Sequence, residues 1–143
     1  MNNYCYDEIA IGQTDRFSIQ ITQEMQNAFL DITGDNNPMH IDEAYAQSKG
    51  FRGKLVYGML TASFYSTFVG VLLPGKKCLL QDAEIKFRKP VFIGDVLEIK
   101  GECVDKYDTF KQLLLKVKIY NQNKELVSSA KLNVAVGGTV IEQ

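Results

Sequence analysis

Residues 58–73 read GMLTASFYSTFVGVLL, and this uncharged stretch decides the fold. It is too long for a typical strand and too short for a membrane span. Pro74 and Gly75 end it. A helix that is apolar nearly all round must be buried, so we expect one central core helix over residues 58–73. Its Val, Phe and Tyr content also suits strands, which leaves two buried strands as the alternative.

The second half of the chain alternates apolar and polar residues with the period of two that is typical of strands. The alternating segments are residues 83–88, 97–103, 113–119 and 126–136, and residues 16–21 near the N-terminus follow the same pattern. Successive strands joined by short turns imply an antiparallel sheet with one polar face. The apolar face needs a cover, which only the 58–73 helix provides. Periodicity alone therefore predicts an α+β fold.

Two shorter helices are expected between the first strand and the core helix. Thr22 is a suitable N-cap for the first of them, and Gly34 ends it. Residues 41–49 form the second, with Asp42 as its cap. The expected apolar face of the first helix consists of Met25, Phe29 and Ile32.

The turn after the first helix holds the only histidine of the chain, His40, five residues after Asp35. Asn36, Asn37 and Pro38 lie between them and favour an irregular turn. Activation of water needs such a pair, in which a carboxylate takes a proton and an imidazole shares or returns it. For the pair alone, a plain turn with a surface histidine is the alternative interpretation.

The pattern extends beyond this pair. Residues 29–46 resemble the signature of the MaoC-like (R)-specific enoyl-CoA hydratase/dehydratase family, also called hydratase 2. Residues 56–60 and 89–95 resemble two further segments of the family, and the similarity covers residues 10–136. It implies the hot-dog fold, an antiparallel sheet wrapped round a long central helix, in one domain over residues 1–143. The matching signature residues are Phe29, Ile32, Thr33, Gly34, Asp35, Asn37, Pro38, His40 and Ala46, with Met39 where the family usually has Leu, Ile or Val.

The resemblance also implies a reaction. Family members add water across the 2,3 double bond of a trans-2-enoyl thioester to give an (R)-3-hydroxyacyl thioester, or run the reverse dehydration. Asp35 and His40 then activate the water, and the Gly58 N–H donates to the thioester oxygen. Ser66 helps to orient the aspartate, and Asn37 supports the loop. A plain helix glycine and a serine bonded to its own helix backbone are the alternatives for Gly58 and Ser66.

One departure from the family pattern concerns the residue before the helix glycine. Many relatives have His at this position, where the chain has Tyr57. Because Asp35 and His40 are intact, we expect the chemistry to be kept and the pocket mouth or substrate choice to differ.

Composition limits the partners. The formal net charge is -1 without a basic block, which argues against nucleic acid and anionic membranes. The 3 cysteines show neither zinc nor Cys-x-x-Cys spacing, so idle thiols in a reducing cytoplasm are expected. One histidine cannot build a multi-histidine metal site within one chain, and we expect no cofactor. The resemblance implies an acyl-CoA or acyl-carrier-protein thioester as substrate, and a homodimer or dimer of dimers.

Three alternatives to the CoA hydratase remain. A dehydratase on acyl-carrier-protein or pathway-specific thioesters is not separated from it by sequence. A hot-dog thioesterase often carries a carboxylate on the central helix, and residues 58–73 contain no Asp or Glu. A non-catalytic acyl-thioester binding module predicts a lost acid or base, whereas Asp35 and His40 are both present.

Overall fold

The computed structural model describes residues 1–137, so the last six residues of the expected domain lie outside the described part. Within it, five strands form one sheet in the order β1-β3-β4-β5-β2, and every neighbouring pair is antiparallel. The elements are β1 (Thr14–Gln20), α1 (Gln23–Thr33), α2 (Pro38–Ile41), α3 (Glu43–Ser48), α4 (Gly58–Thr67), β2 (Cys78–Phe87), β3 (Val96–Tyr107), β4 (Gln112–Tyr120) and β5 (Leu126–Val136).

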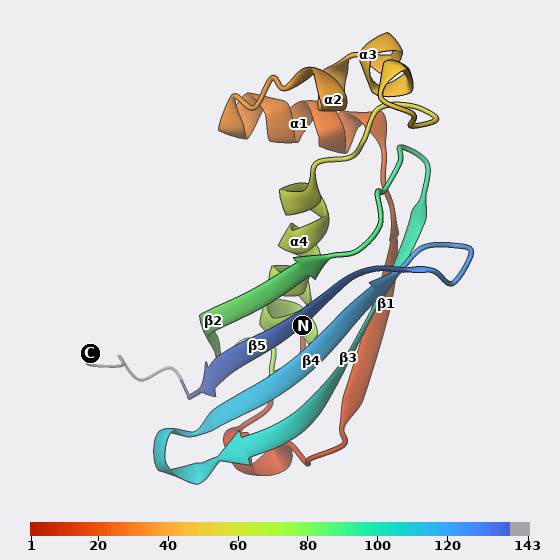
Figure 1. Cartoon of the computed structure of the whole chain (residues 1–143). Helices are drawn as coiled ribbons and strands as arrows, with labels where there is room; N and C mark the ends of the chain where they lie inside the picture. Colours follow the sequence, from red (N-terminus) through yellow and green to blue (C-terminus); the bar gives the residue numbers. More distant parts are fainter. Residues whose placement is uncertain (138–143) are drawn as a thin grey trace.

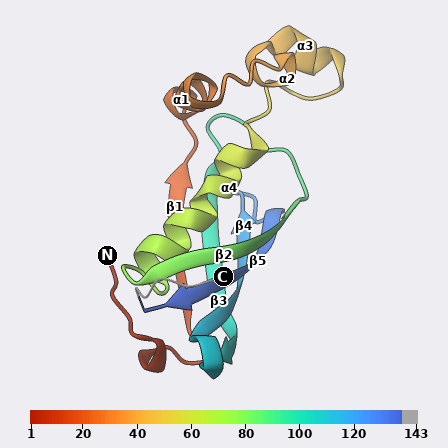
Figure 2. The ribbon, with the colours of Figure 1, turned by 90° about the vertical axis from the view of Figure 1, so that its left-hand side faces the viewer.

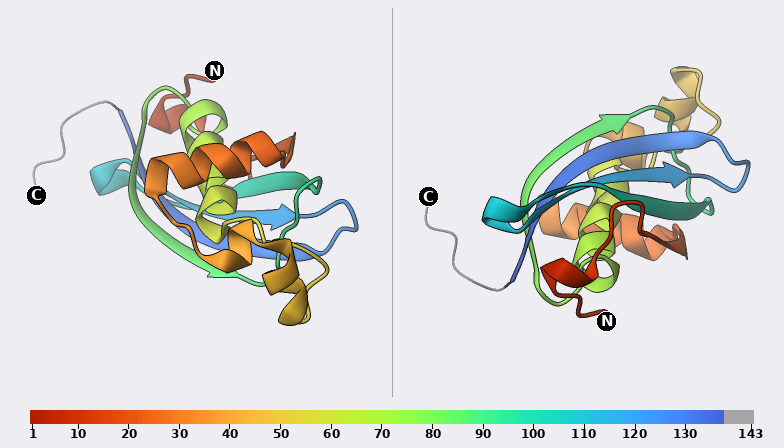
Figure 3. Two further views of the ribbon diagram at one scale, coloured as in Figure 1. Left: turned by 90° about the horizontal axis from the view of Figure 1, so that it is seen from above. Right: turned by 90° about the horizontal axis from the view of Figure 1, so that it is seen from below.

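The sheet curves round α4, as Figures 1 and 3 show. Residues 68–72 continue α4 as a wider π-helical turn, so residues 58–72 form one helical segment. The expected central helix is thereby confirmed, and the alternative of two strands is wrong. The strands present their alternating apolar residues to this helix, which gives the expected hot-dog arrangement. Fully buried examples from the helix and from β3, β4 and β5 are Phe68, Leu97, Ile99, Leu113, Leu115, Ile119 and Leu132.

A glycine in β3 allows the helix to approach the sheet closely. Gly101 shares the inward-facing period of Leu97 and Ile99. A Cβ atom at Gly101 would overlap the Phe68 ring, so the ring occupies the space where a side chain would stand. The close packing of this large ring thus depends on a residue without a side chain.

The three short helices α1, α2 and α3 lie beyond one end of the sheet, at the N-terminus of α4 (Figures 1 and 2). Thr22 caps α1 through its hydroxyl, which accepts from the Met25 N–H, and Gly34 ends the helix at φ 70°. Both predicted ends of α1 are confirmed. The helix therefore stops where the Asp35–His40 segment begins.

Two details of this end differ from the sequence prediction. Pro38–Ile41 forms the short helix α2 with Asn37 as its cap, so His40 lies on a helical turn and not on irregular chain. On α1, Ile32 is 81% exposed and Gln26 is 2% exposed, so the expected apolar face is wrong at its last position. The polar Gln26 is buried because its amide is fully engaged, as described below.

Strand β2 is an outer strand of the sheet, and its apolar residues are poorly covered. Leu79, Leu80 and Phe87 are 47%, 38% and 54% exposed. The alternation predicted an inward face for this strand, but only Ile85 in the predicted segment is even half-buried.

No helix among the described residues is long and apolar enough to cross a bilayer.

Candidate active site

The buried side chain of Gln26 joins α1 to the histidine segment and to the start of α4. Its Nε2 donates to the carbonyl oxygens of His40 at 3.1 Å and Leu55 at 3.0 Å. Its Oε1 accepts from the Tyr57 N–H at 3.3 Å. One amide therefore satisfies three backbone groups that are 14 to 31 residues away in the chain.

His40 is held in one tautomer by the same segment. Its Nδ1 lies 2.8 Å from the carbonyl oxygen of Leu55. A carbonyl can only accept, so Nδ1 carries the proton and donates. In the neutral imidazole, Nε2 is then left with a free lone pair. This is the protonation pattern that a general base requires.

Asp35 begins the exposed turn that leads to His40. Its Oδ1 accepts from the Asn37 N–H at 3.2 Å, and the Asn37 side chain accepts from the Met39 N–H at 2.9 Å. These two bonds fold residues 35–39 onto themselves and start α2. The observed contacts of Asn37 are those of a residue that shapes the loop.

Tyr57, the residue before α4, contacts both members of the predicted pair. Its hydroxyl donates to the backbone carbonyl oxygen of Asp35 at 2.5 Å. Its ring stacks on the His40 imidazole, with centroids 4.2 Å apart and planes 29° apart. Phe29 packs on the same ring at a centroid distance of 4.8 Å. Burial and the nearby charge of Asp35 raise the pKa of Tyr57, so the hydroxyl keeps its proton at neutral pH.

A cavity of about 350 Å³ opens beside this cluster. His40, Gly58 and Thr61 line it together with residues at the end of β2. The Thr61 hydroxyl is buried, and within residues 1–137 it has no hydrogen-bond partner. Such a group ordinarily costs about 1–3 kcal/mol, so its presence in a cavity wall is typical of a site that receives a polar ligand.

Two of the predicted site residues, His40 and Gly58, thus line one cavity. Gly58 begins α4, where the first N–H groups have no intrahelical acceptor and the positive end of the helix dipole lies. A Cβ atom at Gly58 would lie 3.2 Å from the Phe87 ring, which packs against the glycine from β2. A side chain at this position would crowd the Phe87 ring, so glycine allows this close packing.

Three predicted site residues, Asp35, Asn37 and Ser66, lie outside the cavity wall. Asp35 is not among the lining residues and is connected to His40 through Tyr57. Ser66 is exposed two turns along α4, and in the described part of the chain no hydrogen bond joins it to Asp35. The orienting role of Ser66 stays a prediction.

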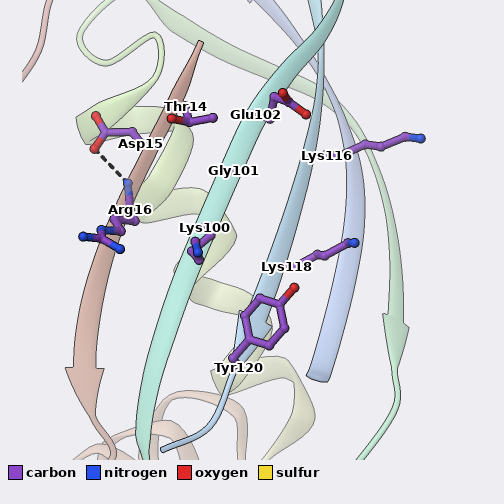
Figure 4. Close-up of a pocket in the computed structure, with 9 residues that line it drawn as sticks. All are labelled: Thr14, Asp15, Arg16, Lys100, Gly101, Glu102, Lys116, Lys118 and Tyr120. Atoms are coloured by element: carbon purple, nitrogen blue, oxygen red, sulfur yellow. Dashed lines mark hydrogen bonds between the residues drawn. The ribbon is translucent and has the colours of Figure 1, made fainter. Parts of the chain in front are cut away.

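A second and larger hollow, of about 720 Å³, lies on the outer face of the sheet (Figure 4). Its labelled side chains come from β1, β3 and β4, and they are mainly charged, with Arg16, Lys100 and Glu102 as examples. None of the residues between Phe29 and Ala46 contributes to it. The smaller cavity contains His40 and the larger hollow contains no residue of the motif, so we take the smaller cavity as the candidate active site.

Gln26, Tyr57, Leu55 and Thr61 were not predicted as site residues. A glutamine between Met25 and Phe29 looks like the polar edge of a helix, because its backbone partners are far away in the sequence. Leu55 acts only through its carbonyl oxygen, which its side chain does not reveal. The one available signal was Tyr57 itself, since it replaces a residue that the family motif usually has.

Replacing Gln26 by Leu is expected to lower the free energy of unfolding by at least about 2 kcal/mol. The change leaves the His40 carbonyl and the Tyr57 N–H without their partner and removes one of the two bonds to the Leu55 carbonyl. Each unpaired group costs about 1–3 kcal/mol. Urea unfolding of the parent and the variant measures the difference.

Gln23→Leu, one turn earlier on α1, is the control. Gln23 bonds only the side chains of Asn27 and Lys54, which water can solvate instead, so stability should change by no more than about 1 kcal/mol. Equal effects of the two substitutions would show that the buried amide does not connect these segments.

Comparison with known proteins places this geometry in a family. The MaoC like domain matches residues 8–124. The (R)-specific enoyl-CoA hydratase of Aeromonas caviae is 31% identical over 118 residues, which cover 82% of this chain and 88% of the relative. The 3-hydroxybutyryl-CoA dehydratase of Methylorubrum extorquens is 32% identical over 100 residues, which cover 70% of this chain and 64% of that protein. The chain thus spans slightly less than two thirds of the latter relative.

Solved structures agree with the sequence matches. An unliganded R-hydratase, PhaJ1 from Pseudomonas aeruginosa, superposes with a TM-score of 0.88 at 25% identity and covers 99% of this chain and 94% of its own. The (R)-hydratase of Aeromonas caviae gives a TM-score of 0.86 at 29% identity over 90% of this chain and 98% of its own. With the domain match over most of the chain, these likenesses show that the chain belongs to the MaoC-like domain family.

Proposed function

We propose that the protein is a hydro-lyase that adds water to a trans-2-enoyl-CoA to give the (R)-3-hydroxyacyl-CoA, or runs the reverse dehydration. The observation that carries the proposal is the joint placement of His40 and the Gly58 end of α4 in one cavity wall. The names of relatives such as the Aeromonas caviae hydratase support the same reaction. The unpartnered Thr61 hydroxyl supports a ligand with polar atoms in this cavity.

The chemistry needs two proton movements and one site for negative charge. Asp35 and His40 hold the water, and one of them takes its proton while the hydroxide oxygen bonds to C3. Negative charge then builds on the thioester oxygen, which accepts from the Gly58 N–H. The pair finally delivers a proton to C2, so the sum is addition of one water. Proton transfer of this kind contributes about 10²–10⁴-fold in rate, and one oxyanion donor contributes about 10²–10³-fold.

His40 is suited to act on the water through Nε2, because Leu55 occupies Nδ1. Asp35 is suited to work as its partner, because its turn is fixed by Asn37 and by the Tyr57 hydroxyl.

The carrier of the acyl group is proposed to be CoA. Two mitochondrial relatives are named as 3-hydroxyacyl-[acyl-carrier-protein] dehydratases, one from Arabidopsis thaliana at 28% identity and one from Solanum lycopersicum at 36% identity over a shorter stretch. Crotonyl-CoA and crotonyl-acyl-carrier-protein should therefore be compared side by side. Loss of the enoyl absorbance with the CoA thioester supports the proposal. If only the carrier-protein thioester is turned over, the substrate is an acyl-carrier-protein thioester and not a CoA thioester.

We also propose that the working form is a homodimer or a dimer of dimers in the cytoplasm. Leu79, Leu80 and Phe87 leave apolar surface exposed on an outer strand, which pairing of two copies would cover. Cys5, Cys78 and Cys103 are free thiols, as is usual in a reducing compartment. Light scattering should give a mass of two or four chains, and a stable 16.1 kDa species at micromolar concentration would contradict the dimer.

The proposed function is tested by mixing the purified protein with crotonyl-CoA and following the enoyl absorbance. Chiral analysis of the product should give the (R)-3-hydroxy acid. An (S) product would contradict the stereochemistry while keeping the hydratase. Binding of acyl-CoA without turnover, on both crotonyl-CoA and a longer enoyl-CoA, would overturn the proposal in favour of a binding module.

A further inference from the structure

Tyr57 contacts Asp35 and His40 and directly precedes Gly58. Its backbone carbonyl accepts from the N–H groups of Leu60 and Thr61, each at 3.1 Å, so it caps the helix that Gly58 begins. Its side chain reaches the Asp35 carbonyl with the hydroxyl and the His40 imidazole with the ring face. The oxyanion donor, the acid and the imidazole are therefore all in contact with, or next to, one side chain.

We infer that Tyr57 is a positioning residue that fixes Asp35, His40 and the start of α4 relative to one another. The inference rests on the proposed function for its kinetic consequences. Tyr57 does not line the cavity, so it has no direct contact with a substrate there. It acts through the two residues that do the proton chemistry.

The surroundings of Tyr57 make it rigid enough for this role. Its side chain is 2% exposed, lies between Phe29 and His40, and its N–H is bonded to the buried Gln26 amide. The imidazole is consequently fixed on two sides, by the Tyr57 ring on its face and by the Leu55 carbonyl at Nδ1. Asp35 is exposed, and its link to the buried interior is the hydroxyl bond from Tyr57.

The two contacts predict separable effects. Tyr57→Phe removes the bond to Asp35 and keeps the ring on His40, whereas Tyr57→Leu removes both. Misplacing catalytic groups by about 1 Å can cost about 10²-fold in rate. We expect kcat on crotonyl-CoA to fall about tenfold in Tyr57→Phe and about 10²-fold in Tyr57→Leu, with KM changed less than about twofold in each.

Tyr65→Phe is the matched control. Tyr65 is an equally buried tyrosine two turns along α4, and its hydroxyl donates to the Ser128 hydroxyl at 2.7 Å. The Tyr65→Phe variant therefore loses a buried tyrosine hydrogen bond, and Tyr65 has no contact with Asp35 or His40 among the described residues. We expect the melting temperature to fall by a similar amount in Tyr57→Phe and Tyr65→Phe. We expect kcat to fall only in Tyr57→Phe. Equal kcat values in the two variants would overturn the inference.

A spectroscopic measurement decides the placement without turnover. His40 is the only histidine, so its imidazole protons give one set of resonances. A stacked aromatic ring shifts such resonances upfield, so Tyr57→Leu should move them downfield, while Tyr57→Phe and Tyr65→Phe should not. The Asn36 amide, which shares the peptide group of the Asp35 carbonyl, should move in Tyr57→Phe. Unchanged His40 and Asn36 resonances in the variants overturn the inference. If the variants show these shifts but the parent protein has no activity on crotonyl-CoA, only the proposed function is overturned.

Discussion

Replacing Asp35 by Asn is expected to lower kcat/KM on crotonyl-CoA by about 10²–10⁴-fold, the usual contribution of a positioned acid–base group. Asparagine has the same shape as aspartate, and its Oδ1 can still accept from the Asn37 N–H that now bonds the carboxylate. The bond from Tyr57 goes to the backbone of residue 35 and is also kept. The turn is therefore preserved, and the variant loses the negative charge together with the ability to accept and return a proton.

Asp31→Asn is the control for this experiment. Asp31 is an exposed aspartate in the last turn of α1, four residues before Asp35. It removes the same charge from the same end of the molecule without touching the proton chemistry, so its kcat/KM should stay within about twofold of the parent. A parent-like rate in Asp35→Asn, or an equal loss in both variants, would remove Asp35 from the mechanism and leave only a general effect of charge.

The strands and the helix ends could be predicted from the sequence because local chemistry determines them. Thr22 and Gly34 have the residue types that begin and end a helix, and both do so in the structure. The order of the strands could not be predicted, because it depends on contacts between distant segments. Phe87 is an example: it occupies an apolar position in an alternating segment, as the buried strand residues do, but it is exposed because its strand lies at the edge of the sheet.

The predicted site residues follow from a motif, but their arrangement depends on backbone groups that a sequence does not reveal. The Leu55 carbonyl selects the tautomer of His40, and the Gln26 amide holds that carbonyl in place. Glutamine on an otherwise amphipathic helix gives no sign that it will be buried. Tyr57 was visible as a departure from the family motif, yet its bond to Asp35 became apparent only when the fold brought residues 22 positions apart together.

Replacing His40 by Asn and by Gln separates the two nitrogens of its imidazole. The Asn amide can occupy the place of Nδ1 and donate to the Leu55 carbonyl, but it has no atom at the position of Nε2. The longer Gln side chain brings an amide near the position of Nε2, and this amide does not take up a proton at neutral pH. If Nε2 exchanges the proton with water, both variants should lose about 10²–10⁴-fold in kcat/KM.

The two His40 variants should differ in stability even though both are inactive. His40→Asn keeps the Leu55 bond, so its free energy of unfolding should exceed that of His40→Gln by about 0.5–1.5 kcal/mol, the usual net value of one hydrogen bond. Urea unfolding measures this difference, and the enoyl absorbance measures the rates. A His40→Asn variant with substantial activity would show that the imidazole serves only to hold the Leu55 carbonyl. Asp35 would then be left as the sole proton-transfer group, because His40 is the only histidine that the chain contains.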